Sequence, residues 1–210
     1  MKVCEIFTSI QGESSYAGLP CTFVRLTGCN LRCSYCDTQY AYDEGVDITI
    51  SEIAEQVLSA GTYLVEITGG EPLMQNETAA LAEHLSGMGH RVLIETNGSL
   101  DISCLKHIPL VTVIMDIKTP SSGMSGNNDY ANIARLTRDD EVKFVIGSRE
   151  DYTWAAEIIR QYEIDSICKI LMSPIIAPAA LVKWILNDGL NVRLNIQLHK
   201  YIFGPDLRGV

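Results

Sequence analysis

Long apolar segments are absent from this sequence of 210 residues. No segment approaches the roughly 20 consecutive apolar residues that are needed to span a bilayer. The opening segment MKVCEIFTSIQGE also lacks the uninterrupted apolar core of a signal peptide. We therefore expect a cytoplasmic protein that has no membrane partner.

Basic residues are scarce as well. The sequence has 16 lysines and arginines against 26 aspartates and glutamates, which gives a formal net charge of −10. It contains neither a run of Lys and Arg nor aromatic residues interleaved with basic ones. A chain of this charge repels phosphate backbones. We expect no nucleic-acid partner and a small molecule as substrate.

The sequence also lacks the composition of a disordered chain. Hydrophobic residues make up 47% and charged residues 20%, which is ordinary for globular proteins. The length is sufficient for one domain with a sizeable core, and no repeat or interdomain linker interrupts it. We predict a single domain over residues 1–210.

Short β-branched or apolar segments alternate with segments of helical spacing. The expected strands are Thr22–Leu26, Leu64–Thr68, Val92–Glu95, Val111–Ile117, Val142–Ile146, Ile167–Met172 and Val192–Leu198. The expected helices are Ser51–Ser59, with a Ser N-cap, and Glu77–Met88, Asp151–Tyr162 and Pro178–Asn187. This alternation predicts an α/β fold with mostly parallel strands.

About seven strands are too few for a complete eight-stranded barrel, so we predict an open, partial β/α barrel. In parallel α/β sheets, ligands lie beyond the carboxyl ends of the strands. The loops at 27–50, 68–76, 96–100 and 118–128 should therefore converge on one site.

Three of the seven cysteines, Cys29, Cys33 and Cys36, fall within eight residues. Three soft ligands at this spacing favour an iron-sulfur cluster or zinc. A structural zinc site needs a fourth ligand, and no second CxxC or paired His/Cys motif supplies one, although an isolated thiol could. Three ligands on a four-iron cluster leave one iron open to a small molecule. The other four cysteines look like ordinary buried thiols: Cys4, Cys21, Cys104 and Cys168.

Two motifs resemble the radical S-adenosylmethionine (SAM) superfamily: CNLRCSYC at residues 29–36 and TGGEP at residues 68–72. The resemblance implies a 4Fe-4S cluster on the three cysteines and SAM bound to its open iron. Without that order of motifs, GGEP would be read as a turn. The residues that the resemblance assigns to SAM are Tyr35, Asp37, Gly69, Gly70, Glu71, Asp116, Ile117 and Lys118, followed by Thr96 and Asn97.

Further segments resemble the 7-carboxy-7-deazaguanine synthase family over essentially the full length. They are EIFTSIQGE at residues 5–13, TFVRLTGCNLRCSYCDT at residues 22–38 and QLHK at residues 197–200; Ser14 replaces the family's usual Gly. The resemblance implies conversion of 6-carboxy-5,6,7,8-tetrahydropterin into 7-carboxy-7-deazaguanine with loss of ammonia, started by hydrogen abstraction. SAM acts as a regenerated cofactor in that family.

The same resemblance implies residues for the substrate and for Mg²⁺. A carboxylated pterin needs planar hydrogen-bond partners and a cation, and Thr38 would bind the Mg²⁺. The residues assigned to the substrate are Ile10, Gln11, Gly12, Glu13, Arg25, Thr68, His199 and, through its terminal carboxylate, Val210. Taken alone, these residues would be read as a surface turn, an arginine salt bridge and a structural histidine.

Two other functions fit the cysteines. A radical SAM activase that installs a glycyl radical in a partner protein shares the motif and the size, but the Gln-Gly-Glu segment argues against it. A non-catalytic iron-sulfur or zinc module leaves the other motifs unexplained. The resemblance also implies a homodimer, and a flavodoxin or ferredoxin is the expected electron donor.

Overall fold

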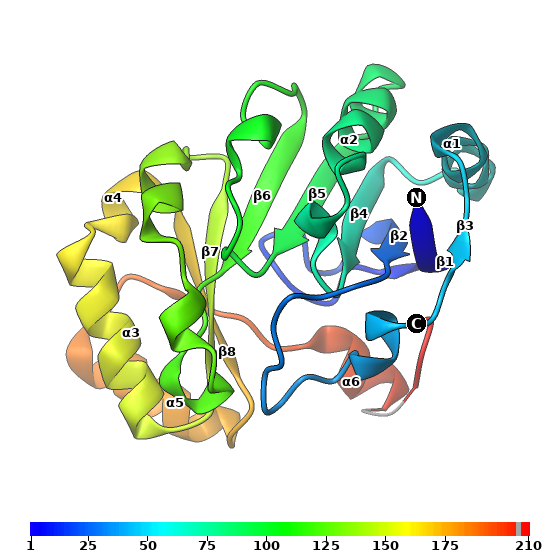
Figure 1. Ribbon diagram of the computed structural model, residues 1–210. Coiled ribbons are helices and arrows are strands. Elements are labelled where there is room, and N and C mark those ends of the chain that lie inside the picture. Colours follow the sequence, from blue (N-terminus) through cyan, green and yellow to red (C-terminus); the bar gives the residue numbers. More distant parts are fainter. Residues whose placement is uncertain (205–206) are drawn as a thin grey trace.

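The computed structural model describes residues 1–204 and 207–210. Its strands form one open sheet in the order β3-β1-β2-β4-β5-β6-β7-β8-β9 (Figure 1). The strands are β1 (Lys2–Ile10), β2 (Pro20–Leu26), β3 (Val46–Asp47), β4 (Leu64–Gly69), β5 (Arg91–Thr96), β6 (Val111–Asp116), β7 (Glu141–Ile146), β8 (Lys169–Pro174) and β9 (Arg193–Leu194).

From β2 to β9 every neighbouring pair of strands is parallel. β1 is antiparallel to both β2 and β3. The order of β4 to β9 in the sheet follows the order in the chain, as successive crossovers in one direction produce. The predicted open, mostly parallel α/β sheet is confirmed.

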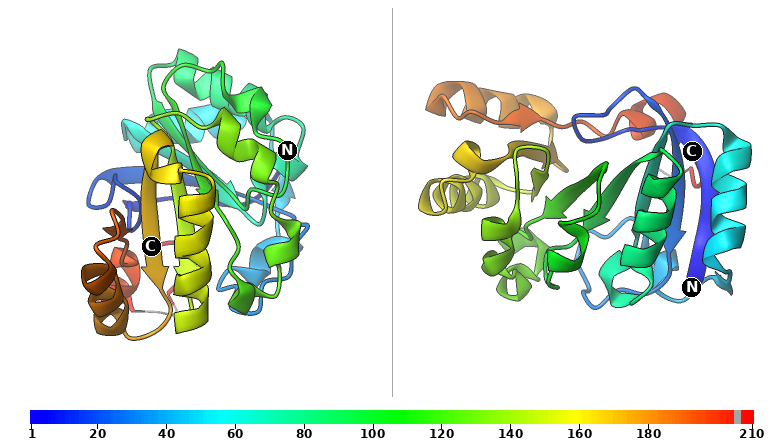
Figure 2. Two further views of the ribbon diagram at one scale, coloured as in Figure 1. Left: turned by 90° about the vertical axis from the view of Figure 1, so that its left-hand side faces the viewer. Right: turned by 90° about the horizontal axis from the view of Figure 1, so that it is seen from above.

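The helices are α1 (Ile50–Ala60), α2 (Thr78–Gly87), α3 (Arg149–Gln161), α4 (Ile164–Ile167), α5 (Pro178–Asp188) and α6 (Leu198–Phe203). The first five lie on crossovers between parallel strands, while the β5–β6 and β6–β7 connections contain only short 3-10 turns and α6 follows β9. Figure 2 shows α1, α2 and α3 ranged along one face of the curved sheet. The N-cap of α1 is Thr49, whose side chain forms a capping box with Glu52, so the prediction of a serine N-cap was wrong.

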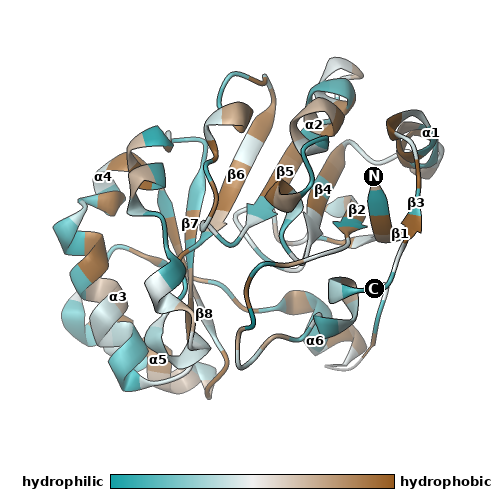
Figure 3. Cartoon of the chain, viewed as in Figure 1, coloured by the Kyte–Doolittle hydropathy of each residue, from teal (hydrophilic) through white to brown (hydrophobic). Residues whose placement is uncertain are grey.

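Alternate residues of the strands enter two different apolar clusters. Val24, Val65 and Ile67 face the helices in the large core, while Phe23 and Leu64 belong to a small cluster on the other face. In Figure 3 the central strands are largely brown, that is hydrophobic, and much of α3 is teal. Helices α1 to α5 therefore cover one face of the sheet, and the other face is left to enclose the site.

The strand prediction missed β1 and β3 and made the last strand too long. β1 is only half-buried, so its apolar pattern is weak. Strand β9 ends at Leu194 instead of Leu198, because Asn195 turns to bond the Ser173 hydroxyl and the Leu198 N–H donates to the Gly12 carbonyl. The chain leaves the sheet there to reach the loop after β1.

All seven cysteines are free thiols. Cys21 and Cys168 are buried as expected, but Cys104 is exposed and Cys4 is only half-buried, so the prediction of a buried thiol was wrong for these two. Cys104 lies in a short 3-10 turn before β6, outside the packed core. Within residues 1–204 and 207–210, no helix has the length and apolarity to cross a membrane.

Candidate active site

The three clustered cysteines lie on the loop that follows β2. All three are half-buried, and the Cys36 N–H closes a turn onto the Cys33 carbonyl at 3.2 Å. Burial raises the pKa of the Cys29 and Cys33 thiols, although Lys118 acts in the opposite direction. A bound metal is what makes thiolates favourable in such a place.

Gly69 and Gly70 let the end of β4 approach this loop. A Cβ atom on Gly70 would lie 2.1 Å from the Gly28 carbonyl oxygen and 2.8 Å from the Cβ of Cys29. Gly69 has a φ of +146°, and a Cβ atom on it would clash with the backbone of Leu26. The Glu71 N–H then donates to the Gly28 carbonyl at 2.7 Å. Glycine is therefore required here by the contact between the two loops.

The side chain of Glu71 is fully buried and bonded internally. It accepts hydrogen bonds from Leu73 N–H at 3.0 Å, from the Thr96 hydroxyl at 2.7 Å and from Asn97 N–H at 2.6 Å. The carboxylate thus ties the loop after β4 to the loop after β5. It does not line the cavity described next.

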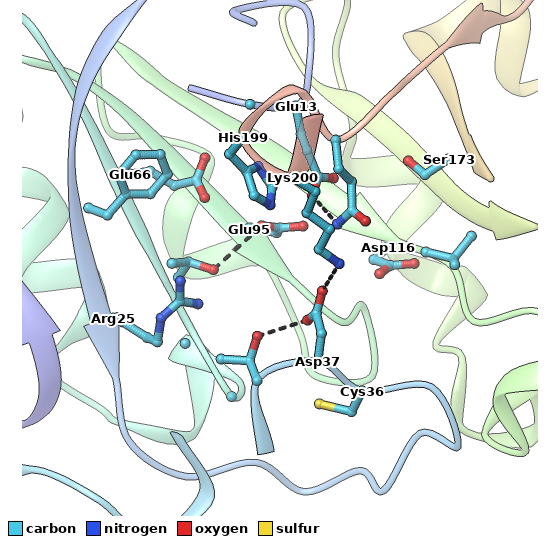
Figure 4. Close-up of a pocket in the computed structure, with 18 of the residues that line it drawn as sticks. Glu13, Arg25, Cys36, Asp37, Glu66, Glu95, Asp116, Ser173, His199 and Lys200 are labelled. Carbon is cyan, nitrogen blue, oxygen red and sulfur yellow. Dashed lines mark hydrogen bonds and ion pairs between the residues drawn. The ribbon is translucent and has the colours of Figure 1, made fainter. Parts of the chain in front are cut away.

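A cavity of about 630 Å³ opens at the carboxyl ends of the strands. Except for Glu71 and Ile117, every site residue expected from the sequence lines it. Ile117 is instead buried in the large core. Figure 4 shows side chains from distant parts of the chain, among them Arg25, Asp116 and His199, around this one space. The convergence expected for these loops is observed.

The loop after β1 forms one wall of the cavity. The Gln11 Nε2 donates to Glu66, and its Oε1 accepts from the Glu13 N–H at 2.9 Å. A Cβ atom on Gly12 would lie 2.1 Å from the Nδ1 of His199, so α6 packs directly on this glycine. Ser14 has a φ of +64°, a left-handed conformation that favours glycine.

A cluster of charged groups lines the cavity next to this loop. Lys143 lies 3.2 Å from the Glu13 carboxylate, contacts Glu95 and lies 4.0 Å from Asp116. Burial alone would lower the pKa of Lys143, but the charges of Glu13 and Glu95 raise it well above its ordinary value. Asp116 bonds Lys118 through Oδ2 at 2.7 Å, while its buried Oδ1 has no hydrogen-bond partner in the described part of the chain. That oxygen is available to a ligand.

Arg25 forms the salt bridge considered from the sequence and also lines the cavity. Its Nε lies 2.7 Å from Glu5, and its guanidinium lies over the rings of Phe7 and Tyr40 at 5.8 and 5.9 Å. Its two Nη atoms have no hydrogen-bond partner among residues 1–204 and 207–210. They remain free to bind an anionic group.

The end of the chain returns to the cysteine loop. Lys200 forms an ion pair with Asp37, whose other oxygen accepts from the Thr38 hydroxyl at 2.9 Å (Figure 4). Burial lowers the pKa of His199, so its ring is neutral near pH 7. Arg208 lies 3.8 Å above the Tyr40 ring and 2.8 Å from Glu44, and Val210 reaches the cavity lining.

The chain is similar to known proteins in sequence and in fold. Residues 23–175 match the Radical SAM superfamily. The chain is 45% identical to the 7-carboxy-7-deazaguanine synthase of Chlorobaculum tepidum, over 100% of this chain and 97% of that protein. It is 42% identical to the enzyme of that name from Koribacter versatilis, over 100% of both.

The chain belongs to the 7-carboxy-7-deazaguanine synthase family. The crystal structure of QueE from Escherichia coli has the same fold, with a TM-score of 0.79 at 23% identity over 94% of each chain. As a radical SAM enzyme, this member of the synthase family uses a 4Fe-4S cluster and SAM. The residues fit these groups, since three free thiols and the unpartnered Oδ1 of Asp116 border one cavity.

Sequence reasoning missed several polar residues that line this synthase site, among them Glu66, Lys143 and Ser173. Each of these three lies on a strand and faces the cavity instead of following the strand in a loop. A signal did exist for two of them, because Glu66 and Lys143 interrupt apolar strand segments, LVEITG and EVKFVI. A charge inside a buried strand is costly unless it serves a partner or a ligand.

Proposed function

We propose that the chain converts 6-carboxy-5,6,7,8-tetrahydropterin into 7-carboxy-7-deazaguanine with loss of ammonia. The main support is that one cavity joins the cysteine loop and the Gly69–Gly70 turn to the Gln11–Glu13 loop and His199. The radical source and a pterin-sized polar space would thus face each other. The names of the relatives support the same reaction.

On the cofactor side, Cys29, Cys33 and Cys36 would hold three irons. When bound, the cluster and SAM supply the 5′-deoxyadenosyl radical that starts the reaction. Asp116 offers its free oxygen to a hydroxyl or amino donor. The remaining residues proposed to surround SAM are Tyr35, Asp37, Gly69, Gly70, Thr96, Asn97 and Lys118. Glu71 and Ile117 would act by holding these loops in place, since both are buried away from the cavity.

On the substrate side, the Nη atoms of Arg25 are proposed to bind the substrate carboxylate. Neutral His199 both donates and accepts a hydrogen bond, which suits the polar pterin ring. The other proposed substrate contacts are Ile10, Gln11, Gly12, Glu13, Thr68 and the terminal carboxylate of Val210. Together they would orient the substrate and exclude water from it.

The Thr38 hydroxyl is the proposed protein ligand of Mg²⁺. It lies in the cavity lining next to Asp37, whose pKa is about 2 because Lys200 outweighs the effect of burial. Magnesium commonly keeps most of its waters and takes few protein oxygens. The ion would polarise the substrate carboxylate.

We also propose a single domain, a cytoplasmic location, a homodimer, and a flavodoxin or ferredoxin as electron donor. One large core that runs from Val3 to Leu181 supports a single domain. Seven free cysteines suit a reducing compartment. The resemblance to the family supports the dimer, and a monomer by light scattering would refute it.

The zinc module is disfavoured by the arrangement of side chains. Within residues 1–204 and 207–210, no three His, Cys, Asp or Glu side chains are placed to hold one metal ion. The ligands of a four-iron cluster bind different irons and need not converge on one point.

The stoichiometry of SAM tests the proposal against the activase. In an anaerobic assay with reductant and Mg²⁺, product should exceed the SAM supplied, because SAM is regenerated, and should require the carboxypterin. Consumption of SAM in proportion to an activated protein, without need for a pterin, would overturn the proposal.

A further inference from the structure

Glu66 lies where a carboxyl group is least expected. It is in the middle of β4, and its side chain is only 4% exposed. Its neighbours in register are Phe23 on β2 and Leu93 on β5, both members of the small apolar cluster inside the sheet. Packing alone would favour an apolar residue at this position.

Only one carboxyl oxygen of Glu66 has a protein partner. Oε2 accepts from the Nε2 of Gln11, while Oε1 has no hydrogen-bond partner in the part of the chain that the structure describes. Glu66 lines the cavity, and Figure 4 shows its carboxyl group directed into it, towards the space beside His199 and Glu95. The free oxygen is thus presented to whatever fills the cavity.

The polar side chains of the Gln-Gly-Glu motif are already occupied. The amide oxygen of Gln11 accepts from the Glu13 N–H. The Glu13 carboxylate accepts from Gln197 at 2.8 Å, from Lys143 at 3.2 Å and from Asn195 at 3.3 Å. These hydrogen bonds hold the loop of the motif in place. Glu66 has the free oxygen on this wall.

We infer that Glu66 binds the 2-amino edge of the pterin ring and thereby selects a 2-amino-4-oxopyrimidine substrate. The inference rests on the proposed function and adds to it a residue outside the motifs. A carboxylic acid presents a hydroxyl donor beside a carbonyl acceptor. The pterin edge presents the complementary pair, a ring-nitrogen acceptor (N1) beside an amino donor.

The surroundings of Glu66 favour this neutral form. Burial raises its pKa well above the ordinary value, and the nearby charges of Glu95 and Glu13 raise it further. A protonated Glu66 would donate from Oε1 to N1. Its Oε2 has two lone pairs and would accept from both Gln11 and the 2-amino group.

The test compares two ligands on the anaerobic, cluster-loaded protein with SAM and without reductant, so that no turnover occurs. The ligands are 6-carboxy-5,6,7,8-tetrahydropterin and its analogue with hydrogen in place of the 2-amino group, and calorimetry gives their Kd values. Wild-type protein should prefer the pterin by about tenfold or more. Glu66→Leu should bind the pterin about tenfold or more weakly and lose the preference.

Glu66→Gln keeps a carbonyl acceptor beside an N–H donor, so it should keep both affinity and preference within about threefold. SAM binding should be unchanged in every variant, and in turnover Glu66→Leu should raise KM more than it lowers kcat. Glu66→Ala repeats the test with a smaller side chain, and Glu55→Gln, an exposed glutamate of α1, is the matched control.

Equal wild-type affinity for the two ligands overturns the inference without any variant. If Glu66→Leu still prefers the pterin over the analogue, the inference is also overturned, and Glu66 would serve only to hold Gln11 in place. If wild-type protein binds neither ligand, the proposed function fails along with the inference. If it binds both equally, only the inference fails.

Discussion

The Nζ atom of Lys143 lies 3.2 Å from the Oε2 atom of Glu13, although 130 residues separate them. A cation on β7 thereby holds the loop after β1 in place. Lys143 itself is buried and also pairs with Glu95, so removing it leaves two half-buried carboxylates without their shared counter-ion.

We predict that Lys143→Met lowers the thermal unfolding midpoint by roughly 6 °C or more, because breaking a buried ion pair costs about 3 kcal/mol or more. Circular dichroism on the cluster-loaded protein measures it. The control is Lys183→Met, an exposed lysine of α5, which should change the midpoint little. Equal shifts in the two variants would contradict this role of Lys143.

The fold was largely predictable because the parallel strands are continuous apolar segments. β1 was not predictable in this way, because it is a half-exposed antiparallel strand without a continuous apolar segment. Its residues were noticed only as part of the motif EIFTSIQGE. The site was predictable where residues follow strands, as with Cys29 or Asn97. Glu66 and Lys143 were not, because only the curvature of the sheet turns their strand face into the wall of a cavity.

For one residue, the contact implied by the motif resemblance differs from the contacts in the structure. Glu71 was expected beside SAM, yet its carboxylate is saturated by Thr96, Asn97 and Leu73. The sequence around Glu71 contains no sign of this, since two of the partners lie about 25 residues away, at and just after the end of β5.

Glu71→Gln should weaken SAM binding by about tenfold or more. One oxygen becomes an NH₂ group facing an N–H or hydroxyl donor, so the loop at Asn97 loses its anchor. Equilibrium dialysis of cluster-loaded protein with SAM measures the Kd. Glu77→Gln, an exposed residue before α2, is the control. Unchanged affinity in Glu71→Gln would show that the anchor is dispensable.

Gly70→Ala should prevent the cysteine loop from closing on β4. The new Cβ would overlap the Gly28 carbonyl oxygen, and such overpacking costs about 1–3 kcal/mol. We expect lower iron content after reconstitution together with reduced stability. At Gly87 a Cβ atom meets nothing within 4 Å, so Gly87→Ala should keep its iron. Full iron content in Gly70→Ala would refute the required close approach.

The buried carboxyl of Glu66 should make stability depend on pH. In the unfolded chain it loses its proton near pH 4.5, whereas in the folded chain its raised pKa retains the proton to higher pH. The folded state therefore binds more protons in this interval, and stability falls as pH rises through it. Glu66→Gln lacks this loss, so its unfolding midpoint relative to wild type should rise between pH 5 and pH 8. Parallel profiles would contradict a protonated Glu66.

Product analysis tests the proposed synthase reaction itself. Iron-reconstituted protein is incubated anaerobically with reductant, Mg²⁺, SAM and 6-carboxy-5,6,7,8-tetrahydropterin, and the products are identified by mass spectrometry. Wild-type protein should form 7-carboxy-7-deazaguanine and Cys33→Ala none, while Cys104→Ala, at an exposed thiol, should still form it. The formation of 5′-deoxyadenosine without the deazaguanine, by protein with an intact cluster, would contradict it.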